Sequence, residues 1–224
     1  MTGLTRLTPI AHPPLSVALT ALLAGSTAAA HPHVFIDGGV DFILGPGQVL
    51  EALEVTWRYD EFETLYTLAS FGVSLDAAGE LAEPDRQRVI FEHSNWPDDF
   101  DGSAHLSIDG IAVPTQWPSN LDARMVDGRL EVSFLRRLSD PTPVSRRDVE
   151  VGFYESTYFF AFAVTDTPVT HGSASTCATR AIPFKFDPDD TELVAALERL
   201  ALDETPAVQG FGALVADRVE LRCD

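Results

Sequence analysis

The sequence has little positive charge, with 15 lysine and arginine residues against 34 aspartates and glutamates. Only Arg6 among the basic residues, and none of the acidic ones, precedes residue 31, so residues 31–224 carry 14 bases and 34 acids. Nucleic acids and anionic membrane surfaces are bound through clustered lysine and arginine. The balance therefore argues against nucleic acid as a partner and favours cations, although excess carboxylate also serves solubility alone.

Cysteine is scarce as well, since Cys177 and Cys223 are the only two. They lack the C-x-x-C spacing that is typical of a thiolate metal pair. Two cysteines in an oxidising compartment most simply form one disulfide. The sequence therefore predicts a Cys177–Cys223 bridge that closes the end of the chain onto the body.

Signatures of catalysis are missing. The chain has no Gly-x-Ser-x-Gly elbow, glycine-rich phosphate loop or His-Glu-x-x-His motif. His171 precedes Ser173, Ser175 and Cys177, which resembles a base near nucleophiles, but Cys177 already has an expected disulfide partner. We predict that the protein is not an enzyme.

Long apolar runs are confined to the first thirty residues. Arg6 is their only charge, residues 15–25 are apolar, and residues 28–30 are the small residues of a cleavage site. A membrane helix needs about 20 apolar residues. Residues 1–30 are therefore predicted to be a removed secretory signal peptide, and residues 31–224 a periplasmic protein that is not embedded in the membrane.

Short strand-like runs separated by turn residues dominate the rest of the chain. Residues 34–44 and 49–59 predict a β-hairpin around a Gly-Pro-Gly turn. Further strands are expected at 104–108, 111–117, 123–126, 130–135, 149–154, 158–165, 178–186 and 215–221, and helices at 61–70, 84–92 and 190–202. We predict a mainly β, α+β fold whose antiparallel, sandwich-like body carries two or three short helices. One domain is expected, with two intimate subdomains that divide near 95–103 as the alternative.

Aromatic residues gather in two stretches. In residues 61–70 they recur at helical spacing, which predicts a helix that packs through its aromatic face. Residues 154–162 hold five rings, and because a sandwich interior needs large apolar residues, a central core strand is predicted, with a ligand groove as the alternative. The same core role is expected for Trp57, Trp96 and Trp117.

The stretch His31-Pro32-His33 follows the expected cleavage site directly. Cleavage after Ala30 lets the new α-amine and the imidazole of His31 chelate one ion, and His33 points to the same side of an extended strand. Pro32 has no amide hydrogen, which excludes a backbone-amide copper site. We therefore predict one transition-metal ion, copper, zinc or nickel, bound by His31 and His33.

Further ligands are expected among nearby carboxylates, with Asp37 and, more weakly, Asp60 as candidates. Asp60 also suits the N-terminus of a helix, where a carboxylate satisfies free backbone amides. The other histidines, His93, His105 and His171, are each more typical of surface or capping positions.

Five blocks of sequence carry a family resemblance: residues 31–37, 55–62, 127–130, 154–162 and 216–223. Together they resemble the bacterial periplasmic family called domain of unknown function 1007, over essentially the whole chain after the leader. The resemblance implies an exported protein associated with metal-ion transport systems, especially nickel/cobalt-type exporters. It implies no enzymatic activity.

One stretch departs from the family pattern. Members often carry an EF-hand-like loop, but here residues 74–85 lose most ligands, because Ser74 and Ala78 replace carboxylates and Asp85 is too short to act as a bidentate glutamate. We expect no calcium there. The stretch is predicted to be a surface loop that leads into a helix.

These observations predict a periplasmic accessory protein that binds a transition-metal ion at its processed N-terminus. It would assist a nickel/cobalt, zinc or copper transport or resistance system and pass the ion to or from a membrane metal permease. One alternative is a histidine-brace copper monooxygenase, because such enzymes also hold copper by a terminal and a second histidine. The other is a metal-free, solute-binding component of a transporter that uses the aromatic block.

Overall fold

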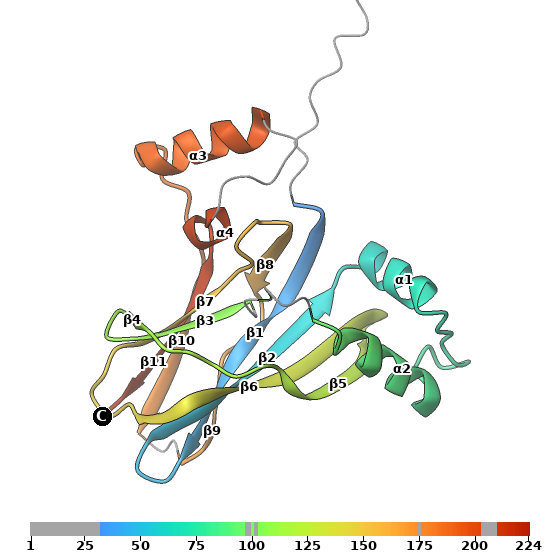
Figure 1. Cartoon of the computed structure of the whole chain (residues 1–224), viewed down its shortest axis with the longest axis horizontal. Coiled ribbons are helices and arrows are strands. Elements are labelled where there is room, and N and C mark those ends of the chain that lie inside the picture. The colour runs from blue at the N-terminus through green and yellow to red at the C-terminus, as the bar shows by residue number, and fades with distance from the viewer. Residues whose placement is uncertain (1–31, 97–99, 101–102, 174–175, 203–209) are drawn as a thin grey trace, which may run out of the picture.

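The computed structural model describes residues 32–96, 100, 103–173, 176–202 and 210–224. Two β-sheets form its body, and short helices lie around them (Figure 1). The elements are β1 (Val34–Gly45), β2 (Val49–Tyr59), α1 (Glu61–Ser70), α2 (Glu83–His93), β3 (Ala104–Ile108), β4 (Ile111–Ala112), β5 (Ser119–Val126), β6 (Arg129–Pro143), β7 (Val149–Phe153), β8 (Phe160–Val164), β9 (Thr170–Gly172), β10 (Cys177–Ile182), α3 (Thr191–Leu202), α4 (Phe211–Leu214) and β11 (Asp217–Cys223). The predicted β-rich α+β fold is confirmed.

The first sheet has six strands in the order β5-β6-β2-β1-β8, with β9 also paired to β1. The β1–β2 hairpin is antiparallel, as predicted, but β8 and β9 both run parallel to β1. β8 pairs with the beginning of β1 and β9 with its end, so the two lie at opposite ends of that strand. The body is therefore not wholly antiparallel.

The second sheet has five strands in the order β10-β11-β7-β3-β4. Alternate residues of its strands and of the first sheet are buried together in one hydrophobic cluster, as expected for two sheets that share a core. Phe42, Leu53 and Phe134 come from the six-stranded sheet, and Val151 and Leu221 from the five-stranded sheet. Within each strand, the residues that alternate with these core residues point to the outer faces of the sheets, because side chains alternate along a strand.

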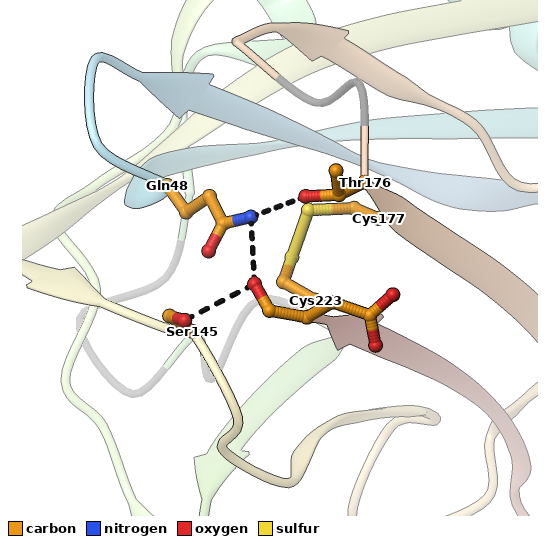
Figure 2. The surroundings of a disulfide bond; sticks show 6 residues. Gln48, Ser145, Thr176, Cys177 and Cys223 are labelled. Carbon is orange, nitrogen blue, oxygen red and sulfur yellow. Dashed lines mark hydrogen bonds between the residues drawn. A yellow bond between two sulfur atoms is a disulfide. The ribbon is translucent and has the colours of Figure 1, made fainter.

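The predicted disulfide is confirmed. Cys177 and Cys223 are direct partners in the β10–β11 pair, and their Cα atoms are 4.1 Å apart. Beside the bridge, Gln48 donates to the Thr176 hydroxyl at 2.6 Å, and Gln48 and Ser145 both donate to the main-chain carbonyl of Asp224, each at 3.2 Å (Figure 2). The end of the chain is therefore tied both to its neighbouring strand and to the β1–β2 turn.

Helix α1 has the predicted bounds but packs through a different face. Its buried residues are Thr64, Thr67 and Leu68, and the Thr64 hydroxyl accepts a hydrogen bond of 3.0 Å from the backbone amide of Leu130 on β6. The small threonines allow this close approach to the sheet. The aromatic face is exposed instead, with Phe62, Leu65 and Tyr66 at 76%, 69% and 61%.

Other differences follow from how far strands extend. β6 continues to Pro143 rather than ending at 135, whereas β4 is only two residues long. β8 lies at a sheet edge, so residues 160–164 are half-buried rather than a central core strand. Trp57 is buried in the core, but Trp117 is 53% exposed.

In the described residues, no helix has both the length and the apolar character that a membrane crossing requires.

Candidate metal centre

The predicted N-terminal site is described only in part, because His31 lies outside the described residues. His33 immediately precedes β1 and is exposed. Its backbone amide donates to the carbonyl of Phe159 at 2.9 Å, and its ring centroid lies 4.8 Å from that of Phe159. The start of the strand is thus anchored to the chain that leads into β8.

The two carboxylates predicted beside these histidines have other partners. Asp37 forms an ion pair of 2.7 Å with Arg129. Asp60 is the N-cap of α1 and accepts a hydrogen bond of 2.7 Å from the backbone amide of Glu63, which is the alternative role expected from sequence. A metal at either carboxylate would compete with these contacts, and their role as ligands stays a prediction.

Two further histidines are engaged with the fold. The Nδ1 of His93 lies 3.0 Å from the carbonyl of Val89, and its Nε2 lies 3.1 Å from the hydroxyl of Tyr59. Burial lowers the pKa of His93, so its imidazole is neutral near pH 7 and its Nε2 accepts from Tyr59. His105 stacks on Tyr154 with the ring centroids 3.8 Å apart. Both rings serve packing.

His171 has different surroundings. It lies with Asp41 and Glu54, and one potential ligand atom from each of the three side chains falls within 4.8 Å of the others. The His171 Nε2 is 3.2 Å from a carboxylate oxygen of Asp41 and 3.7 Å from one of Glu54. The three residues come from β9, β1 and β2, so three strands converge on one point.

The hairpin register creates the acidic half of this cluster. Asp41 and Glu54 are direct cross-strand partners in the β1–β2 pair, and like charges in such positions repel each other. Both side chains point to the outer face of the sheet, since their neighbours Val40, Phe42 and Val55 are buried in the core. A cation between the two carboxylates would offset the repulsion.

The segment that carries His171 is held against β1 by two features. One oxygen of Asp41 accepts from the backbone amide of Val169 at 2.9 Å, which leaves the other facing His171. Gly172 has φ +84°, and a Cβ there would overlap the carbonyl oxygen of Leu44. Glycine is therefore required where the chain turns away after His171.

The cluster offers one imidazole nitrogen and carboxylate oxygens, which together suit divalent transition metals such as zinc, nickel and copper. Its side chains are 29% (Asp41), 42% (Glu54) and 48% (His171) exposed, so an ion can reach it and water can complete the coordination. From the sequence, His171 is more typical of a surface or capping position, and neither Asp41 nor Glu54 is among the expected ligands.

The fold and this cluster define a β-rich protein with a candidate cation site on one sheet surface. A family model described as "Protein of unknown function (DUF1007)" matches residues 16–223 of the chain. The chain therefore belongs to this family, which confirms the resemblance expected from the sequence blocks. A comparison with curated proteins gives no match.

Proposed function

We propose that the protein is a periplasmic accessory component of a metal-ion transport or resistance system, and that it binds one divalent transition-metal ion at Asp41, Glu54 and His171. The observation that carries the proposal is the convergence of these three side chains from separate strands within 4.8 Å. Two directly opposed carboxylates gain most from a divalent partner, because each unit of added positive charge offsets one negative charge.

The N-terminal histidines form a second, separate site in this proposal. His33 and Asp41 are eight residues apart along an extended chain, which corresponds to about 26 Å. One ion therefore cannot contact both. His33, anchored at the start of β1 and exposed, would bind a second ion together with His31 once the signal peptide is removed.

The cellular role rests on several supporting features. The acidic composition favours cations over nucleic acids or anionic membranes, and the disulfide is compatible with an oxidising extracytoplasmic compartment. A surface site with half-exposed ligands releases its ion more readily than a closed structural site, which suits transfer to or from a membrane metal permease.

Isothermal titration calorimetry with Zn(II), Ni(II), Co(II) and Cu(II) tests the proposal. The substitutions Asp41→Asn, Glu54→Gln and His171→Ala should each weaken binding at the cluster by at least about tenfold. Asp41→Asn keeps the oxygen that accepts from Val169, so it removes charge without removing that hydrogen bond. Glu61→Gln, which removes an exposed carboxylate on α1, is the matched control and should leave the affinity unchanged.

The two proposed sites are separated by His33→Ala. Native mass spectrometry of the exported protein should show two ions for the wild type, one for His33→Ala and one for His171→Ala. If every cluster variant binds these metals as tightly as the wild type, the cluster is not the site, and a remaining loss in His33→Ala would assign binding to the N-terminus alone.

A further inference from the structure

A cavity of about 710 Å³ opens on the other side of the six-stranded sheet from the Asp41–Glu54–His171 cluster. It lies where β2 and β8 meet the ends of α1 and α2 and the loop that precedes β8. Trp57 forms part of its wall from the buried face of β2, whereas Glu54 points to the opposite face of the same strand. The volume falls in the range of small-molecule binding sites.

Aromatic rings make up most of the cavity wall. The ring centroid of Trp57 lies 5.5 Å from that of Trp96 and 5.6 Å from that of Phe162, and Trp96 stacks on Phe100 at 4.2 Å. The ring of Phe160, also in the wall, has its centroid 6.5 Å from that of Trp57, with an angle of 28° between the two ring planes. Rings from three segments, which are β2, the chain between α2 and β3, and β8, therefore surround one space.

The charge of the cavity has one sign. The described residues that line it include the carboxylates of Glu92 and Glu155 but no lysine or arginine. Glu155 is fixed in place, because it accepts hydrogen bonds from the amide and the hydroxyl of Thr157, both at 2.8 Å, and from the amide of Phe159 at 3.0 Å. The Cζ atom of Arg136 lies 5.9 Å from the centroid of the Phe100 ring, but Arg136 is not part of the lining.

The other titratable groups of the lining are neutral partners of each other. Tyr59 and His93 share the 3.1 Å hydrogen bond described above, and neither brings positive charge to the cavity. The cavity thus combines π faces with carboxylates.

We propose that this cavity binds a small organic cation of the quaternary ammonium class. Aromatic rings attract such cations through their electron-rich faces, and the carboxylates of Glu92 and Glu155 add favourable charge at a site whose described lining holds no lysine or arginine. The site is independent of the proposed metal cluster.

Tryptophan fluorescence titration with choline, paired with its neutral isostere 3,3-dimethyl-1-butanol, tests the proposal. The two molecules have the same shape and hydroxyl, so they differ in charge alone. Choline should bind at least about tenfold more tightly than the isostere. Equal binding of the two would overturn the assignment to cations and identify an apolar site, and no binding of either would overturn the proposal.

Two variants place the binding in the cavity. Phe160→Leu keeps an apolar side chain but removes a π face, and Glu92→Gln removes a charge at an exposed residue of the lining, so each should weaken choline binding several-fold. Phe186→Leu, a substitution at an exposed ring outside the cavity, is the matched control and should bind as the wild type does. Thermal unfolding checks that each variant is folded, and unchanged affinity in both folded cavity variants would contradict the site.

Discussion

The outer face of the six-stranded sheet carries two groups of carboxylates that differ in their cationic partners. In the first group, Arg58 lies between Glu131 and Asp166, and Arg124 also pairs with Glu131. Asp37 adds a pair with Arg129. In the second group, His171 is the one basic side chain that lies against Asp41 and Glu54 among the described residues.

This difference separates a structural cluster from a candidate binding site. The first group contains three carboxylates and three arginines, which are always charged, so it is neutral in itself and has nothing to offer an added cation. The second group contains two carboxylates and one titratable ring, so its negative charge is in excess. Acidic residues on one surface are therefore not equivalent as metal ligands, and their arginine partners decide between them.

The largest expected effect comes from the disulfide, which lies a few residues beyond His171 in the chain. Replacing both Cys177 and Cys223 by serine should lower the free energy of unfolding by up to about 4 kcal/mol, because the bridge closes a 46-residue separation. Urea denaturation measures this loss. In the folded double variant, calorimetry should also show weaker metal binding at His171, since one end of its segment is no longer tied.

Glu131 in the first group and Glu54 in the second should differ in how much their substitution changes the stability of the fold. The side chain of Glu131 is only 3% exposed and pairs with two arginines. The substitution Glu131→Gln should therefore destabilise the fold by about 3 kcal/mol, because it leaves a partly buried arginine with one partner fewer.

Glu54→Gln should instead leave stability unchanged or slightly higher, because it relieves repulsion from Asp41. Urea denaturation of both variants measures the difference in the absence of metal. A similar loss in both would mean that the second group is also a structural cluster.

Much of the fold could be predicted because its signals are local. The β1–β2 hairpin follows from alternation around a Gly-Pro-Gly turn, and α1 from helical spacing and Asp60 at its start. The packing face of α1 could not be predicted, since Thr64 binds to Leu130 at a distant position in the sequence. β9 is three residues long, too short for any periodicity to show.

The candidate site divides in the same way. Alternation along the hairpin places Asp41 and Glu54 on the outer face, but their direct opposition depends on a register shift between Ile43 and Leu44. A count outward from the Gly45–Val49 pair at the turn would place Leu53 opposite Asp41 instead. His171 reaches them across 130 residues through a parallel pairing, and no local pattern reports that contact. The arginine partner of Asp37 is likewise a tertiary feature that sequence spacing does not show.

The smallest expected effect concerns His93, a partly buried histidine, in contrast to the half-exposed His171. Burial lowers its folded pKa below the unfolded value near 6.5, so between these two values the unfolded chain binds a proton that the folded chain does not. The contribution of His93 to the free energy of unfolding is therefore fully present above about pH 6.5. It declines as the pH falls toward the folded pKa, by at most about 1.4 kcal/mol per pH unit. His93→Gln should remove this part of the slope in urea denaturation between pH 5 and 7, whereas His171→Ala should retain it. An unchanged slope in His93→Gln would show that other groups control acid stability, because the glutamine has no proton to gain in that range.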